Sequence, residues 1–129
     1  MAAESPKRLR LGRETRIKHG RDFSRIRLEG QRLASGCVAV NWQPLASGAQ
    51  TRLGVIVGGK IGNAVTRNRA RRLLRETFRV HQHDLAEPVD LVLVARSSVV
   101  RKKFSDVEND LLTALRKARL LKDARRQSL

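Results

Sequence analysis

The chain has 129 residues, of which 28 are Lys or Arg and 12 are Asp or Glu, so its net charge at neutral pH is +16. This length suits one small domain, and a hydrophobic fraction of 40% is enough for one core, which excludes a wholly disordered basic tail. A charge this high makes an extended polyanion the expected partner. Three Phe, one Trp and no Tyr argue against an RNA-recognition motif, which stacks bases on paired aromatic side chains.

Residues 1–16 contain five basic side chains without apolar periodicity, so we expect a basic N-terminal arm there. The arm lacks the apolar segment of a secretory signal, and no apolar run approaches the roughly 18 residues that span a bilayer. We therefore expect a cytoplasmic protein that binds no membrane. Residues 17–121 are expected to form a single domain, and residues 122–129 a basic C-terminal tail.

The first half of the domain is predicted to form a helix at 22–29 and strands at 37–42 and 52–57. Helical spacing of apolar residues before a glycine predicts the helix. Alternation of side chains predicts the first strand, with Val38 and Val40 on the same face. Proline and glycine between the two strands are typical of a turn, so we expect these strands to pair as a hairpin.

The second half of the domain begins with a long helix predicted over residues 65–80. After a proline, the β-branched and apolar run at 89–95 predicts a buried strand. Ser105 and Glu108 have the spacing of a capping box and predict the start of a last helix. Strands mixed with helices, without repeats, predict an α+β fold built as a two-layer sandwich.

The long helix has two chemically different faces, and Asn63 and Thr66 are both acceptable N-caps for it. On a helical wheel, the residues of its core-facing side are Ala70, Leu73, Leu74, Thr77 and Phe78. The opposite side gathers Asn68, Arg71, Arg72, Arg75 and Arg79, and the apolar side is flanked by Arg67 and Arg69. One helix is therefore expected to pack on the core and to hold a compact set of guanidinium groups toward solvent.

Arginine, rather than lysine, dominates this face, and its planar guanidinium can bind phosphate through two hydrogen bonds. A merely solvated helix face is the alternative, but like charges at a spacing of four residues destabilise a free helix. Binding to an anionic membrane is a weaker alternative, because the apolar side is narrow. Gly59 to Gly62 have the GXXG spacing of a KH-domain loop, but a strand leads into them, which favours a sharp turn instead.

No constellation of side chains for catalysis or metal binding stands out. Cys37, the only cysteine, excludes an intrachain disulfide and a four-cysteine zinc site, and we expect it to be a buried hydrophobe. His81, His83 and Asp84, near Glu87, lack the ligand spacing that zinc needs and are expected to be polar loop residues. The twelve acids are scattered, so the sequence does not predict catalysis by the protein itself.

Three stretches together resemble the signature of the bacterial ribonuclease P protein subunit. They are Lys60-Ile-Gly-Asn-Ala-Val65, Arg67-Asn-Arg69 and Arg72-Leu-Leu-Arg-Glu-Thr-Phe78, and the likeness extends over about residues 8–121. The resemblance implies a mainly antiparallel four-stranded sheet with helices and a left-handed crossover at the Arg-Asn-Arg segment.

The resemblance also implies a function, namely the accessory subunit of a ribonucleoprotein that removes the 5′ leader from precursor tRNA. The RNA subunit of that family hydrolyses the phosphodiester with Mg²⁺, so the protein alone is not expected to be catalytic. The implied partners are the catalytic RNA and precursor tRNA, and no obligate protein partner is implied. A ribosomal or assembly protein that binds structured RNA is the alternative function.

Two sets of site residues follow from this resemblance. The RNA-binding set is Arg67, Asn68, Arg69, Arg71, Arg72 and Arg75, to which the helical wheel adds Arg79. Phe23 and Lys60 match positions of the cleft that holds the leader, and Arg27 stands where a second aromatic is frequent. The predicted cleft is completed by Val38 and Val40 as an apolar floor, because a single strand needs a basic track with some apolar surface.

Overall fold

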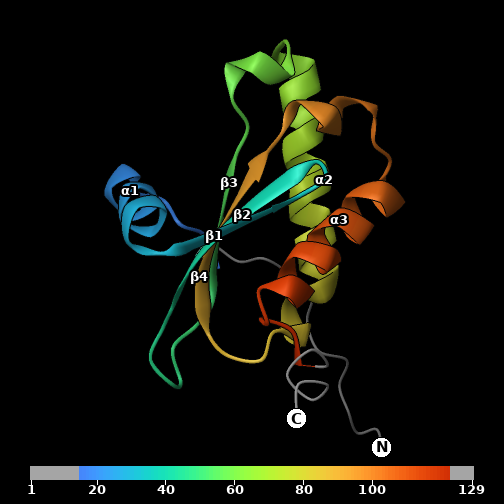
Figure 1. The fold of residues 1–129 in the computed structure, drawn as a ribbon. Coiled ribbons are helices and arrows are strands. Elements are labelled where there is room, and N and C mark those ends of the chain that lie inside the picture. Colours follow the sequence, from blue (N-terminus) through green and yellow to red (C-terminus); the bar gives the residue numbers. More distant parts are fainter. Residues whose placement is uncertain (1–14, 123–129) are drawn as a thin grey trace, which may run out of the picture.

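The computed structural model describes residues 15–122, which form a four-stranded sheet and three α-helices (Figure 1). The strands are β1 (Gln31–Ser35), β2 (Val38–Pro44), β3 (Arg52–Ile56) and β4 (Val89–Ala95). The helices are α1 (Gly20–Glu29), α2 (Ala64–His81) and α3 (Phe104–Lys117). Short 3-10 turns are η2 (Gly59–Ile61), η3 (Gln82–Asp84) and η4 (Ser97–Arg101). These elements confirm the predicted α+β fold.

The basic arm predicted for residues 1–16 and the tail predicted for residues 122–129 lie largely outside the described residues. The last residue of the predicted arm, Arg16, instead belongs to the fold. It forms a parallel β-bridge with Leu53 of β3, and the N–H of Ile17 donates to the Leu53 carbonyl at 2.9 Å. The folded part of the chain therefore begins before residue 17.

The sheet has the strand order β1-β2-β4-β3. β2 pairs antiparallel with β1 and with β4, and β3 pairs parallel with β4. The predicted hairpin between the strands at 37–42 and 52–57 is wrong, because β4 lies between them and hydrogen-bonds to both. β4 can take this central place because its residues are apolar on both faces. The β3–α2–β4 connection crosses between parallel strands, and its left-handed sense stays a prediction.

The hairpin of this sheet joins β1 to β2 instead. Its turn contains Gly36 with φ +59°, a left-handed conformation that glycine adopts without strain. The Asp110 carboxylate of α3 accepts a hydrogen bond from the N–H of Cys37 at 2.9 Å and holds this turn. Cys37 is fully buried, as expected, and burial raises the pKa of its thiol to about 12. β1 was not predicted, because it is half-exposed and lacks the β-branched pattern of a strand.

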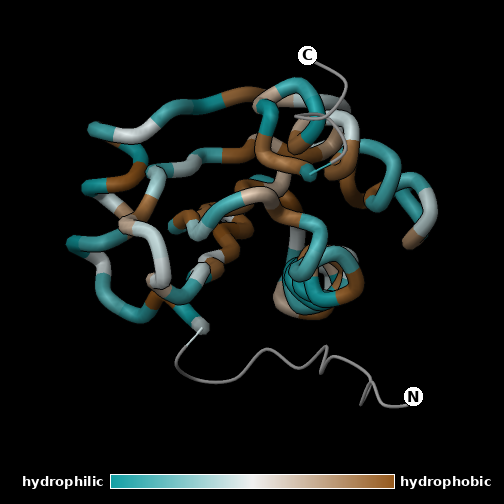
Figure 2. Tube along the Cα trace, turned by 90° about the horizontal axis from the view of Figure 1, so that it is seen from below, coloured by the Kyte–Doolittle hydropathy of each residue, from teal (hydrophilic) through white to brown (hydrophobic). Residues whose placement is uncertain are grey.

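Helices cover the sheet from both sides (Figure 1). α2 and α3 pack on one face, where the main core includes Leu74, Phe78 and Leu111. α1 packs on the other face, where Ile26 contacts a smaller cluster that includes Val92 of β4. Figure 2 shows several hydrophobic stretches, in brown, in the middle of the molecule and many hydrophilic ones, in teal, along its outline. Placing helices on both faces explains why the central strands are buried on both sides.

Val38 and Val40 have no exposed surface and belong to the main core beneath α2 and α3. Alternation along β2 directs both side chains away from α1, so neither can line a cleft on the α1 face. Their assignment to the leader-binding cleft is therefore wrong. The alternating pattern shows which residues share a face of a strand, but not which helix covers that face.

The helix starts differ in how well the sequence predicts them. For α2, the side chain of Asn63 accepts a hydrogen bond from the N–H of Thr66 at 2.9 Å, which selects Asn63 from the two predicted caps. The capping box predicted for Ser105 and Glu108 is wrong. The carboxylate of Asp106 instead accepts from the N–H of Lys103 at 3.0 Å, so the N-cap of α3 is Lys103, two residues before the predicted Ser105.

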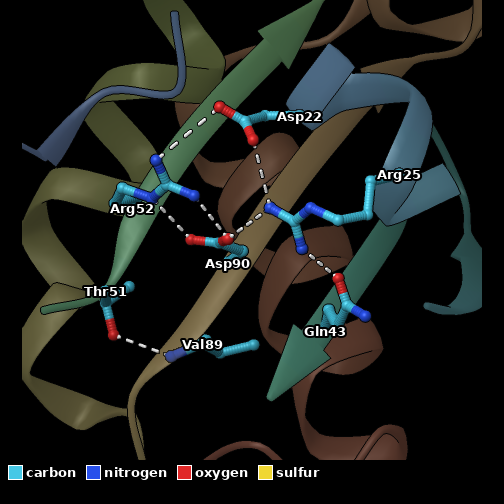
Figure 3. A network of polar contacts seen from close by, with 7 residues as sticks. All are labelled: Asp22, Arg25, Gln43, Thr51, Arg52, Val89 and Asp90. Atoms are coloured by element: carbon cyan, nitrogen blue, oxygen red, sulfur yellow. Dashed lines mark hydrogen bonds and ion pairs between the residues drawn. The ribbon is translucent and has the colours of Figure 1, made fainter. Parts of the chain in front are cut away.

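A buried carboxylate connects α1 to the sheet (Figure 3). Asp90 of β4 is fully buried and accepts two hydrogen bonds from Arg52 of β3, at 2.9 and 2.7 Å. Arg25 of α1 donates to the same carboxylate at 3.1 Å and also to the side chain of Gln43 in β2. Burial on its own would raise the pKa of Asp90, but the hydrogen bonds from Arg52 and Arg25 outweigh it and lower that pKa. The carboxylate therefore stays ionised and joins three strands and a helix.

Replacing this carboxylate by an amide should destabilise the fold without changing its shape. Asp90→Asn leaves two guanidinium groups next to a neutral side chain. We expect a loss of about 2–4 kcal/mol, because breaking a buried ion pair costs about 3–5 kcal/mol and both arginines keep part of their hydration. Urea unfolding at neutral pH measures this loss in the free energy of unfolding, with Glu29→Gln, at an exposed position, as the control. A loss below about 0.5 kcal/mol, the range of an ordinary surface substitution, would contradict this role.

His81, at the end of α2, connects that helix to α3. Its Nε2 lies 2.7 Å from a carboxylate oxygen of Glu108, and its Nδ1 lies 3.0 Å from a carboxylate oxygen of Asp84. Burial alone would lower the pKa of His81, but the hydrogen bonds with Glu108 and Asp84 outweigh it and raise that pKa above its usual value. The ion pairs therefore favour the protonated imidazole in the folded state.

The raised pKa makes the contribution of His81 depend on pH. It should be complete below the unfolded-state pKa of about 6.5 and should be lost as the pH rises through the higher folded-state value. His81→Gln should therefore cost on the order of 1 kcal/mol at pH 5.5 and much less at pH 9. Urea unfolding at both pH values tests this, with the exposed His19→Gln as the control. A cost that is equal at the two pH values would refute the ion-pair explanation.

Candidate nucleic-acid interface

The outer side of α2 forms a strongly basic concave surface. We call it the arginine hollow; it encloses about 670 Å³ and is lined by Arg16, Asn68, Arg71, Arg72, Arg75, Glu76 and Arg79. The helical wheel predicted Asn68 and four of these arginines together on one face, and the structure brings them together. The opposite side of α2 buries Ala70, Leu74, Thr77 and Phe78 in the core, as predicted. Burial of that side fixes which way the arginines point.

Positive charge is unevenly balanced within the arginine hollow. Arg79 makes two hydrogen bonds with Glu76, at 2.8 and 3.0 Å, and Arg71 donates to the amide oxygen of Asn68 at 3.0 Å. Burial lowers the pKa of Arg75, and so do the positive charges of Arg16 and Arg71. Within residues 15–122, no carboxylate pairs with Arg16, Arg71, Arg72 or Arg75. Such a group of guanidiniums is stabilised by an external anion.

Arg67 and Arg69 lie on the flanks of α2, as predicted, and do not line the arginine hollow. Arg69 donates to the backbone carbonyl of Lys102 at 2.8 Å and so connects α2 to the segment after η4. Lys60 is exposed in η2, one loop before α2. The structure thus separates the predicted RNA-binding set into a cluster inside the hollow and single side chains around it.

A second, smaller hollow lies beside Phe23 on the α1 face of the sheet. We call it the Phe23 pocket; it encloses about 80 Å³, and its lining includes Ile17, Gly54 and Arg75. The ring of Phe23 lies directly on Gly54, where a Cβ would come within 2.5 Å of a ring carbon, so glycine is required at this contact. Arg27 is exposed one helical turn after Phe23. These two predicted cleft residues therefore share one side of α1.

The apolar surface near Phe23 comes from residues that the sequence did not single out. Ile56 of β3 and Val94 of β4 are partly buried and pack against the cluster that contains Phe23. They replace Val38 and Val40 as the apolar residues on this face of the sheet. Asp90 and Val94 lie four residues apart on β4, so their side chains point to the same face of the sheet. Knowing that Asp90 faces α1 would therefore have identified Val94, but the sequence does not reveal which residues bind Asp90. Arg16 was missed as a site residue because it was assigned to the basic N-terminal arm, whereas its backbone pairs with Leu53 of β3.

Several titratable side chains outside the arginine hollow are bound to one another. Among residues 15–122, no group of three or more His, Cys, Asp and Glu side chains could hold a metal ion. Asp90 and Asp22 are occupied by arginines, and His81 is held between two carboxylates. No helix in this part of the chain is long and apolar enough to cross a membrane. What the surface provides is a basic hollow next to a smaller one whose lining is partly apolar and partly basic, which suits a polyanion that also carries flat apolar groups.

Comparison with known proteins identifies the family. The model of the Ribonuclease P family matches residues 11–119. The ribonuclease P protein component of Halalkalibacterium halodurans is 34% identical over 111 residues, which cover 86% of this chain and 93% of that protein. The one from Staphylococcus carnosus is 33% identical over 105 residues, covering 81% of this chain and 90% of that protein.

Solved structures agree with the sequence relatives. The RNase P protein of Staphylococcus aureus superposes with a TM-score of 0.76 at 31% identity, covering 84% of this chain and 98% of that one. The RNase P protein of Thermotoga maritima gives a TM-score of 0.68 at 31% identity, covering 76% of this chain and 92% of that one. Similarity over nearly the whole length of these proteins, in both sequence and fold, shows that this chain belongs to the ribonuclease P protein family.

Proposed function

We propose that this chain is the protein component of a bacterial ribonuclease P and that it binds the catalytic RNA of that enzyme through the arginine hollow. The observation that carries the proposal is a helix that buries one side in the core and gathers arginines without carboxylate partners on the other. The core fixes the rotation of α2, so these arginines project from one side of the helix toward the RNA phosphates. The cytoplasm, where bacterial tRNA precursors are made, is the proposed location.

The α1 face is proposed to bind the 5′ leader of precursor tRNA. Phe23, Ile56 and Val94 supply apolar surface there, and the exposed Arg27 of the same helix as Phe23 supplies positive charge. Single-stranded nucleic acid binds to such combinations because bases stack on apolar surface while phosphates contact cations. With one ring in place of several, charge contributes more to this proposed cleft than stacking does.

The RNA subunit is proposed to carry out the hydrolysis of the phosphodiester with Mg²⁺. The described residues do not fit a magnesium site of their own, because they hold no cluster of acidic ligands and the arginine hollow repels cations. Phosphate oxygens of the RNA and substrate would hold the metal instead. The part of this protein is then to bind and align the two RNAs, and it neutralises phosphate charge where they meet.

The test of this function is reconstitution. The full-length protein, added to a bacterial ribonuclease P RNA, should restore cleavage of precursor tRNA at a Mg²⁺ concentration too low for the RNA alone. The protein without the RNA should cut nothing. Strong binding to structured RNA without any gain in cleavage would instead favour a ribosomal or assembly protein.

Binding to the catalytic RNA should depend steeply on salt. If about five guanidiniums contact phosphates, log affinity should fall against log salt concentration with a slope of about −4, at about −0.9 per contact. Arg71→Gln combined with Arg72→Gln should reduce the steepness of this slope by about 2. Arg21→Gln combined with Arg32→Gln removes the same charge from exposed sites outside the hollow and is the control. Equal slopes for the two double variants would show that only total charge matters.

Leader binding should depend on Arg27 at least as much as on the ring of Phe23. Arg27→Ala should lower the affinity of the reconstituted enzyme for precursor tRNA and flatten its salt dependence. Phe23→Leu keeps apolar volume on Gly54 and should lose only stacking, which is worth about 1–3 kcal/mol per base. Neither change should affect mature tRNA, which has no leader. Equal losses for precursor and mature tRNA, or a severe effect of Phe23→Leu alone, would contradict a cleft dominated by charge.

A further inference from the structure

The arginine hollow and the Phe23 pocket are neighbours that share two side chains. Arg16 and Arg75 line both hollows. Arg16 is held at this place by the β-bridge of its backbone with Leu53, and Arg75 is held by the middle of α2. Two guanidiniums from distant parts of the sequence therefore meet at the outer edge of β3, between the face of α2 and the face of α1.

The arginines at this junction have no carboxylate partner among the described residues. Among the described residues, no carboxylate pairs with Arg16 or Arg75, and Arg71 contacts only the neutral amide of Asn68. Burial and the charges of Arg16 and Arg71 lower the pKa of Arg75, so this guanidinium is held in an unfavourable environment. In the same hollow, Glu76 neutralises Arg79. Positive charge without a carboxylate partner therefore remains at the junction.

We propose that Arg16, Arg71 and Arg75 form one phosphodiester-binding site, at which a single RNA strand crosses the edge of β3 between the Phe23 pocket and the arginine hollow. The inference rests on the proposed function in taking RNA as the partner. A phosphate fits because it has several acceptor oxygens for guanidinium forks and relieves the repulsion among three like charges. The ring of Phe23, next to this site, can contact the adjacent base.

The site gives Arg16 a specific role, although Arg16 lies outside the signature stretches between Lys60 and Phe78. Arg16 and Arg75 contact the same phosphate, so the loss of either one should disable most of the site. Arg16 and Arg79 contact different phosphates, so their effects should be independent. The proposal therefore predicts coupling between two particular arginines of a surface that has many.

A double-mutant cycle on the full-length protein tests this coupling, with a fluorescent single-stranded RNA octamer as the probe. Arg16→Gln and Arg75→Gln should each weaken binding about tenfold or more, the range for a hydrogen bond to a charged group. The variant with both changes should bind only slightly more weakly than either single one. The variant that combines Arg16→Gln with Arg79→Gln should lose affinity by the product of the two single fold-changes. Arg21→Gln, an exposed charge outside both hollows, should change affinity about twofold or less.

Neutral linkages in the RNA locate the phosphate. A methylphosphonate is placed at one linkage of the octamer after another. At one position the methylphosphonate should weaken binding of the unmodified protein. At that position the variants Arg16→Gln and Arg75→Gln should then bind the octamer with the same affinity as the unmodified protein. Arg75→Lys keeps the charge but loses the fork, so it should lose most of the affinity that Arg75→Gln loses, which keeps the test valid if the glutamine variant unfolds.

Several results would overturn the proposal. Multiplicative effects of Arg16→Gln and Arg75→Gln would do so, as would an Arg16→Gln effect no larger than that of Arg21→Gln. Failure of the octamer to bind, while the protein still restores cleavage with the catalytic RNA, would refute this site and leave the proposed function standing. Failure of the protein to restore cleavage would refute the proposed function itself, whatever the cycle shows.

Discussion

The ion-pair network around Asp90 is the constraint on which the α1 side of this structure depends. A fully buried carboxylate on the central strand is tolerated only because Arg52 and Arg25 bind it directly. Arg52 comes from the neighbouring parallel strand and Arg25 from α1, so one charge fixes the position of a helix on a sheet. The position of Phe23 and Arg27, both on α1, follows from that attachment.

A second constraint is that α2 has to satisfy two environments at once. Its buried side, which includes Leu74 and Phe78, belongs to the main core and fixes the rotation of the helix. That rotation presents the arginines together, although like charges one turn apart disfavour a helix. Core packing therefore stabilises an arrangement that electrostatics alone would oppose, and the resulting surface is prepared for a polyanion. Among the described residues that line the hollow, Glu76 is the one carboxylate, and it is paired with Arg79.

The two basic and apolar surfaces are adjacent because of the sheet topology. β3 is an edge strand, and its outer edge is bridged by the segment at Arg16. α2 lies on one side of that edge and α1 on the other, so the arginine hollow and the Phe23 pocket meet there. If β3 had paired with β2, as the hairpin prediction assumed, β4 would have stood at an edge and this junction would not exist.

Local patterns were sufficient for much of the fold. Helical periodicity predicted α2 and the grouping of its arginines, and a run of β-branched residues predicted β4. The motif from Lys60 to Phe78 was enough by itself to point to the family. Each of these features depends on residues that are close together in the sequence. Errors appeared where the choice lay between distant partners, as in the hairpin, and in the capping of α3, where Asp106 competed with Glu108.

The sequence by itself therefore determined the type of each main element, the amphipathic division of α2 and the family. Tertiary structure alone decided that β4 separates β2 from β3, that Val38 and Val40 face α2 and α3 rather than α1, and that Arg16 joins Arg75. The physical reason is that periodicity defines the faces of an element, whereas the packing partner of each face depends on contacts between residues far apart in the chain. Asp90 shows this most clearly, because nothing near it in the sequence reveals that Arg25 and Arg52 will bind its charge.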